Sequence, residues 1–246
     1  MRVGLFIPCY IDQFFPGAGI ASLALLRRHT GTVIYPSGQT CCGQPWANAG
    51  MEKDTAELCN HLAGLFAGFD YTVSPSSSCV YHIREHYGHV EQTEQIQKFR
   101  SCCYELTDFL VQILKIEDTG ARFPHRVVLH PGCHGLRGLR NAQASELVLP
   151  SYSRAGSLLS KVKDIEVLSI NRQDECCGFG GTFSVKEEAV SSAMGRDKLR
   201  AITDSGAEYI AATDMSCLMH LDGLARREGL PVKCLHIAEI LNHGAR

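Results

Sequence analysis

Eight of the twelve cysteines in this 246-residue sequence follow one pattern that occurs twice. Each copy has a single cysteine, then an adjacent pair in a Cys-Cys-Gly motif, then another single cysteine. The members are Cys9, Cys41, Cys42 and Cys79 in the first copy, and Cys133, Cys176, Cys177 and Cys217 in the second. Iron–sulfur clusters are held by cysteine thiolates, commonly four per cluster. Each copy therefore supplies enough ligands for one cluster.

The adjacent pairs help to distinguish between kinds of metal site. A mononuclear zinc site uses four tetrahedral ligands, with cysteines typically two to four residues apart. Neighbouring side chains of an extended chain diverge, so Cys41 and Cys42 suit one metal ion poorly but can reach different iron atoms of one cluster. The pattern therefore favours one or two [4Fe–4S] clusters over zinc. Disulfides are disfavoured because the N-terminus lacks the pattern of an export signal.

The cysteines follow segments that are typical of β-strands. Each half begins with an apolar run, RVGLFIPC at 2–9 and RVVLHPGC at 126–133, that ends at a cysteine. Further strand-like segments precede each Cys-Cys pair and each last cysteine, and helical patterns lie between them. This alternation predicts parallel β-α-β units. Because ligands bind at the carboxyl ends of such strands, we expect the four cysteines of each half to meet at one edge of its sheet.

The repeat predicts an α/β fold of two pseudo-symmetric, Rossmann-like halves. Residues 117–126, EDTGARFPHR, are polar and contain Gly and Pro, so the predicted boundary lies there. The first cysteine-rich repeat is expected at residues 1–121 and the second at 122–246. Each half closes with a matching segment that begins at Cys103 or Cys234, and both of these cysteines are expected in the core.

Three helix-boundary signals can be checked against a structure. Pro16 and Gly31 bound a helical segment in the first half. In the second half, Ser184 and Glu187 have the spacing of a capping box. Gly206 is expected just after the end of the helix that follows.

Glycines follow the second Cys-Cys pair. Gly178, Gly180 and Gly181 would let the backbone approach a cluster and direct N–H groups at its sulfur atoms, the alternative being a flexible turn. The first half has the stiffer segment Gly43-Gln44-Pro45, with fewer donors. We therefore expect tighter cluster binding in the second half. The first site is then expected to be empty, zinc-loaded or more easily stripped.

Four histidines lie close to the motif cysteines. His82 and His220 occupy matching positions, three residues after the last cysteine of each half, where outer-shell or structural roles are favoured over ligation. His130 and His134 bracket Cys133 and have no counterparts in the first half. They are expected to face solvent, with proton transfer as the alternative.

Composition excludes several classes of function. The formal net charge of −2 argues against nucleic acid as the main partner. No stretch approaches the roughly 20 apolar residues that cross a bilayer, so no membrane span is expected. Many cysteines in a chain without an export signal predict reduced thiols and a cytoplasmic location.

These motifs resemble those of the cysteine-rich CCG-domain proteins, an iron–sulfur-binding family. The resemblance rests on PCY, PGCHG and CCGFGGTFSVK and covers nearly the whole chain. It points most directly to the members that act in bacterial L-lactate oxidation. Related domains occur in heterodisulfide reductase and in the iron–sulfur subunits of glycolate oxidase and anaerobic glycerol-3-phosphate dehydrogenase.

The resemblance implies that the eight motif cysteines are the cluster ligands. The fuller family motif ends in Cys-x-x-Cys and supplies a fifth thiol to a non-cubane cluster. Here Ser76 and Asp214 stand at the positions of the extra cysteines. A five-thiolate cluster, and a disulfide-reducing activity with it, is therefore disfavoured. The Asp214 carboxylate is a candidate iron ligand, and Ser76 is a weaker one.

The resemblance also implies an iron–sulfur subunit of a soluble complex that oxidises L-lactate to pyruvate, so that lactate serves as a carbon source. Its role would be electron transfer or catalysis. The sequence contains no complete flavin or nicotinamide fingerprint, so partner subunits are expected, namely a ferredoxin-like iron–sulfur protein and a companion. The alternatives are a zinc- or cluster-bearing scaffold for such a complex, or a subunit of a glycolate, glycerol-3-phosphate or disulfide oxidoreductase.

Overall fold

The computed structural model describes residues 1–245 and contains two sheets of four parallel strands. The strands are β1 (Arg2–Leu5), β2 (Thr32–Ile34), β3 (Tyr71–Ser74), β4 (Cys103–Glu105), β5 (Arg126–His130), β6 (Glu166–Leu168), β7 (Tyr209–Ala212) and β8 (Lys233–His236). Their order is β2-β1-β3-β4 in one sheet and β6-β5-β7-β8 in the other. This matching order confirms the predicted α/β fold of two related halves. The boundary between residues 121 and 122 stays a prediction.

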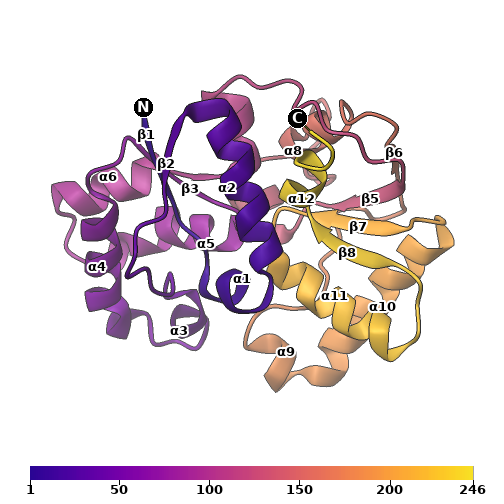
Figure 1. Cartoon of the computed structure of the whole chain (residues 1–246). Coiled ribbons are helices and arrows are strands. Elements are labelled where there is room, and N and C mark those ends of the chain that lie inside the picture. The colour runs from indigo at the N-terminus through magenta and orange to yellow at the C-terminus, as the bar shows by residue number, and fades with distance from the viewer. Residues whose placement is uncertain (246) are drawn as a thin grey trace.

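Helices connect the strands and cover the sheets (Figure 1). In the first half they are α1 (Cys9–Phe14), α2 (Pro16–Thr30), α3 (Gln44–Asn48), α4 (Ala56–Phe66), α5 (Ser77–Tyr81), α6 (Glu94–Cys102) and α7 (Leu106–Asp108). In the second half they are α8 (Arg154–Leu159), α9 (Phe183–Lys186), α10 (Glu188–Asp204), α11 (Met215–Arg227) and α12 (Ile237–Leu241). Short 3-10 or π-helical turns are η1 (Glu52–Thr55), η2 (His82–His86), η3 (Tyr87–His89), η4 (Phe109–Ile113) and η5 (His134–Gly138). Within residues 1–245 no helix is both long and apolar enough to cross a membrane.

Two of the three helix-boundary predictions are confirmed. Helix α2 begins at Pro16 and ends before Gly31, which has a φ of 84°. Gly206, with a φ of 76°, follows the end of α10. The capping box at Ser184 and Glu187 is wrong. The chain winds into the short helix α9 directly after the glycine-rich loop, so Ser184 lies inside a helix and its hydroxyl donates to the carbonyl of Gly181 at 2.8 Å.

Helices of the two halves pack against each other across the interface between them. Helix α2 of the first half packs against α12 of the second, and α7 of the first packs against α8 of the second. Figure 1 shows α2 at the centre of the molecule, between the two sheets. An ion pair of 3.0 Å between Asp108 and Arg154 joins α7 to α8. One apolar cluster includes Val3 of β1 and Val127 of β5, so the core is continuous across both halves.

A buried carboxyl at the start of α7 has a perturbed pKa. Glu105 is fully buried and accepts hydrogen bonds from the backbone N–H groups of Thr107 at 2.9 Å and Asp108 at 3.1 Å. Burial raises the pKa of Glu105 from 4.5 to about 7. The folded chain therefore keeps a proton at pH values where the unfolded chain has lost it. Stability must then fall as pH rises from 4.5 to about 7.

Replacing this carboxyl with an amide should remove that pH dependence. We expect Glu105→Gln to gain about 3 kcal/mol of unfolding free energy relative to the parent between pH 4.5 and pH 7.5, because the amide does not ionise. Urea unfolding at several pH values measures the difference, with the exposed Glu94→Gln in α6 as the control. Parallel stability profiles for Glu105→Gln and the parent would contradict the prediction.

Two candidate metal centres

The four motif cysteines of the first half come together at the carboxyl edge of its sheet. Cys9 is the first residue of α1, Cys41 and Cys42 follow β2, and Cys79 lies in the first turns of α5 after β3. The Cys42 thiol donates a hydrogen bond to the Cys79 sulfur at 3.2 Å. The Cys41 sulfur lies close enough to Cys42 and Cys9 for their thiols to lower its pKa. The four sulfur atoms thus form one continuous group, as the strand order predicts.

The second half repeats this arrangement. Cys133 directly precedes η5, Cys176 and Cys177 lie in the loop after β6, and Cys217 lies in α11 after β7. Cys133 and Cys177 lie close enough to Cys176 for their thiols to lower its pKa. The sulfur atoms of Cys177 and Cys217 lie within 4.8 Å of each other. All twelve cysteines fall in the described part of the chain, and each is free rather than paired in a disulfide.

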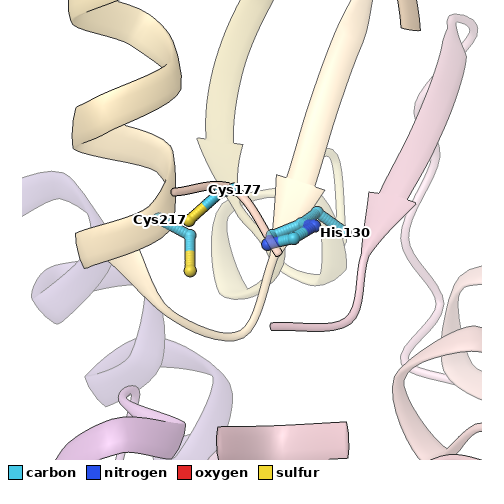
Figure 2. Close-up of side chains that lie close together, drawn as sticks. All are labelled: His130, Cys177 and Cys217. Atoms are coloured by element: carbon cyan, nitrogen blue, oxygen red, sulfur yellow. The ribbon is translucent and has the colours of Figure 1, made fainter. Parts of the chain in front are cut away.

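The second group of thiols has a histidine beside it that was expected to face solvent. His130 ends β5, and one ring nitrogen lies within 4.8 Å of the sulfur atoms of Cys177 and Cys217, which are within the same distance of each other. Figure 2 shows the imidazole facing these two thiols. The expectation that His130 faces solvent is wrong, because its exposed fraction is 1%. The sequence feature that could have predicted its burial is its position in an apolar strand, at the place where the first half has Phe6.

The other flanking histidines have packing roles. His134 is half-buried and its ring packs on Tyr81 with centroids 5.3 Å apart. His82 is buried and its ring stacks on His86 at 5.4 Å. The Nε2 atom of His220 lies 3.3 Å from the carbonyl oxygen of Ser191. Among the cysteines outside the motif, Cys103 is fully buried as expected, whereas Cys234 is only half-buried. Cys59 is also fully buried.

Each group of thiols stabilises at least one thiolate. The neighbouring Cys42 and Cys9 thiols lower the pKa of Cys41 to about 3. The neighbouring Cys133 and Cys177 thiols lower the pKa of Cys176 to about 2. The same interactions raise the pKa values of these neighbouring thiols well above the usual range for a thiol. In the second group the pKa of Cys217 is also lowered, to about 6, chiefly by the Cys177 thiol. Metal ions bind the deprotonated form, so these thiolates are ready to bind, and a metal would displace the protons that the remaining thiols hold.

Backbone amides support these thiolates. In the first half the Gly43 N–H donates to the Cys41 sulfur at 3.4 Å. In the second half the Gly178 N–H donates to the Cys176 sulfur at 3.3 Å, and the Phe179 N–H donates to the Cys177 sulfur at 3.5 Å. The second loop thus has one donor more than the first, in the direction that the sequence predicts.

The remaining two glycines of the loop shape the turn. The carbonyl groups of Gly180 and Gly181 accept hydrogen bonds from the amides of Phe183 and Ser184, both at 3.2 Å, at the start of α9. Both glycines have positive φ values, of 56° and 61°. Within the described part of this loop, the backbone amides that donate to sulfur belong to Gly178 and Phe179, which precede these two glycines.

Gly178 should tolerate no side chain. Its φ is 91°, and a Cβ atom there would lie 2.5 Å from the backbone oxygen of Ser191 in α10. We expect Gly178→Ala to lower the unfolding free energy by roughly 3 kcal/mol and to weaken metal binding by the second half. Gly38→Ala is the matched control, since Gly38 has a φ of 86° with no atom within 4 Å of the added Cβ. If Gly178→Ala and Gly38→Ala lose the same unfolding free energy, the cost comes from backbone strain alone and not from the contact with Ser191.

Asp214 joins the two halves. Its buried carboxylate accepts hydrogen bonds from Ser216 N–H at 3.0 Å, Ser78 N–H at 2.7 Å, Ser76 hydroxyl at 3.1 Å and Tyr10 hydroxyl at 3.1 Å. Ser76 in turn accepts from the Cys79 N–H at 3.3 Å and caps α5. The two residues at the positions of the extra cysteines are therefore hydrogen-bonded to each other. Both Asp214 oxygens are engaged by protein donors, so its surroundings give the predicted iron ligation no support.

Comparison with known proteins agrees with this geometry. A family model described as a cysteine-rich domain (CCG) matches residues 3–84 and 127–222, which include all eight motif cysteines. The chain belongs to this family of cysteine-rich CCG-domain proteins.

Full-length relatives carry a more particular name. The chain is 40% identical over 248 residues to Lactate utilization protein A of Geobacillus thermodenitrificans, with 99% of each chain covered. It is 37% identical to Lactate utilization protein A of Halalkalibacterium halodurans, with 100% of this chain and 98% of the relative covered. A glutamate racemase from Francisella tularensis has a TM-score of 0.37 at 11% identity, covering 98% of this chain and 77% of its own. A likeness that distant supports no argument about function.

Proposed function

We propose that each half holds a [4Fe–4S] cluster through its four motif cysteines, and that the chain is an electron-transfer subunit in the oxidation of L-lactate to pyruvate. The main support for the metal sites is that, in each half, four free thiols meet at the carboxyl edge of the sheet, and the two sheets are equivalent. The relatives named Lactate utilization protein A support the choice of substrate.

The donor set fits an iron–sulfur cluster. Four sulfur ligands per cluster is the usual number, and each half supplies four. When bound, a cluster of this kind supplies one-electron transfer. The chain itself would hold the thiolates, direct the amides of Gly43, Gly178 and Phe179 at them, and bury Cys42 and Cys177 away from water. Amide hydrogen bonds and burial are the means by which a protein tunes such a centre.

Lactate oxidation requires more than this chain. Conversion of a 2-hydroxy acid to a 2-oxo acid removes two electrons and two protons, and a hydride acceptor such as a flavin normally takes them. The sequence has no complete binding fingerprint for such a cofactor. The chain would therefore work with partner subunits, including a ferredoxin-like iron–sulfur protein and a companion, and would pass single electrons between them.

Anaerobic purification tests the proposal at two levels. Iron and acid-labile sulfide should be present in equal amounts, with a broad brown absorption and little zinc. In the complete complex, L-lactate should bleach that absorption, whereas D-lactate and glycolate should not. Colourless, zinc-containing protein would contradict the cluster. Bleaching by glycolate alone would keep the cluster and contradict the substrate.

The rival is a zinc-bearing scaffold for the same complex. The group of His130, Cys177 and Cys217 favours it, because mixed thiolate and imidazole ligands are common at structural zinc sites. The first half is the site where zinc was expected from the sequence. Separate metal analysis of variants that lack one set of cysteines decides between the two metals at each site.

A further inference from the structure

His130 has no hydrogen-bond partner for either ring nitrogen among the described residues. Both Nδ1 and Nε2 are buried and unpaired, and the whole residue is 1% exposed. Buried polar groups are nearly always hydrogen-bonded, so an imidazole with two unpaired nitrogens needs a physical reason. Its surroundings supply one, because its ring faces two thiols (Figure 2).

The distances suit a shared metal atom. One imidazole nitrogen and the sulfur atoms of Cys177 and Cys217 lie within 4.8 Å of one another, and within the described chain this is the one such group of three. Metal–sulfur bonds of about 2.3 Å and metal–nitrogen bonds of about 2.0 Å place two ligands of one tetrahedral metal roughly 3.5 Å apart. The three ligand atoms are therefore close enough to belong to one metal centre.

The first half has no imidazole at the equivalent place. Val3 pairs with Tyr71 in the first sheet, and Val127 pairs with Tyr209 in the second, so the two sheets share a register. Counting along the strands from these pairs places Phe6 at the position of His130. Phe6 is also fully buried, so the duplication has put an apolar ring in one half and a nitrogen donor in the other.

We propose that His130 is a nitrogen ligand of the metal centre in the second half, which is thus a mixed thiolate–imidazole centre beside a thiolate-only centre in the first half. The inference rests on the proposed metal centres and names a ligand outside the eight cysteines. Each iron of a [4Fe–4S] cluster takes one protein ligand, so in such a cluster the imidazole would stand in for one of the four thiolates, and a neutral imidazole carries less negative charge than a thiolate. Histidine ligation therefore raises the reduction potential of an iron–sulfur centre. The second centre is then the one that takes up electrons first.

Cobalt binding tests the ligand without any cluster. The full-length chain with Cys41→Ser and Cys42→Ser leaves only the second site, and Co²⁺ reports thiolate and imidazole ligation by its absorption. We expect His130→Phe to weaken cobalt binding at least tenfold and to change the ligand-field bands. His134→Phe, which keeps an aromatic ring against Tyr81, should bind as the parent does. Equal affinity and spectra for His130→Phe and the parent would overturn the proposal.

A second measurement detects the nitrogen ligand directly in the chain that retains His130. The same two-serine chain, labelled with ¹⁵N-histidine, is reconstituted anaerobically with iron and sulfide and reduced. Pulsed electron paramagnetic resonance should then show one strongly coupled nitrogen. In His130→Phe that coupling should be lost and the reduction potential should shift downward. A cluster without a coupled nitrogen would refute the ligand and leave the iron–sulfur function standing. Failure to assemble any cluster, with cobalt binding still dependent on His130, would refute the function and support the ligand.

Discussion

Replacement of Cys176 or Cys177 by serine is expected to remove most of the iron from the second centre and leave the first loaded. Cys176 is a thiolate of its group, because the neighbouring Cys133 and Cys177 thiols lower its pKa to about 2. A serine hydroxyl stays protonated at neutral pH and is a harder, weaker ligand for iron than a thiolate. If both halves are filled, total iron and sulfide should fall by about half, since each half holds one cluster of four irons.

Cys102→Ser provides the control for this experiment. Cys102 is a half-exposed cysteine at the end of α6 and lies outside both thiol groups. The three variants should be purified side by side without oxygen and compared by iron content and by visible absorption. If iron and absorption stay unchanged in both Cys176→Ser and Cys177→Ser, these two residues are not ligands.

The convergence of the thiols could be read from the sequence because it depends on local patterns. Parallel strands align their carboxyl ends, and Cys9, Cys41 and Cys79 each follow a strand within a few residues. The second copy repeats the same order of strands and cysteines, so a single strand pattern predicted both groups. The turn after each Cys-Cys pair also depends on local sequence, because the glycine that follows the pair has nearly the same φ in both halves, 92° at Gly43 and 91° at Gly178.

What the sequence could not supply depends on contacts between distant residues. The role of His130 is hidden because a histidine beside a turn is usually exposed, and only the register of β5 in its sheet shows that this one is buried. Ser184 and Glu187 have the spacing of a cap, but the glycine-rich loop before them already turns the chain into a helix. The hydrogen bonds of Asp214 could not be predicted, because two of its partners, Ser78 and Tyr10, come from the other half.

Asp214→Ala is expected to cause the largest loss of stability in the metal-free chain. The carboxylate is buried and accepts hydrogen bonds from Ser216 in its own half and from Tyr10, Ser76 and Ser78 in the other half. Removing it leaves those donors unpaired in the interface between the halves. We expect a loss of about 3–5 kcal/mol of unfolding free energy at pH 7, as for the breaking of other buried charge networks.

Asp214 is also the N-cap of α11, so the control is a helix cap that lies away from the interface between the halves. Thr93→Ala removes the cap of α6, where the hydroxyl accepts from the Ile96 N–H at 3.3 Å, and should cost about 1 kcal/mol. Urea unfolding of the reduced, full-length chains gives both values, and similar losses would mean that Asp214 acts only as a cap.

The dependence of stability on acidic pH provides a further check. Burial acts to raise the pKa of Asp214, but hydrogen bonds from Ser216 and Ser78 outweigh it and hold the pKa below 3.8. The contribution of the carboxylate is therefore complete above pH 3.8 and is lost as the pH falls through its folded-state pKa, so Asp214→Ala should flatten that part of the stability profile.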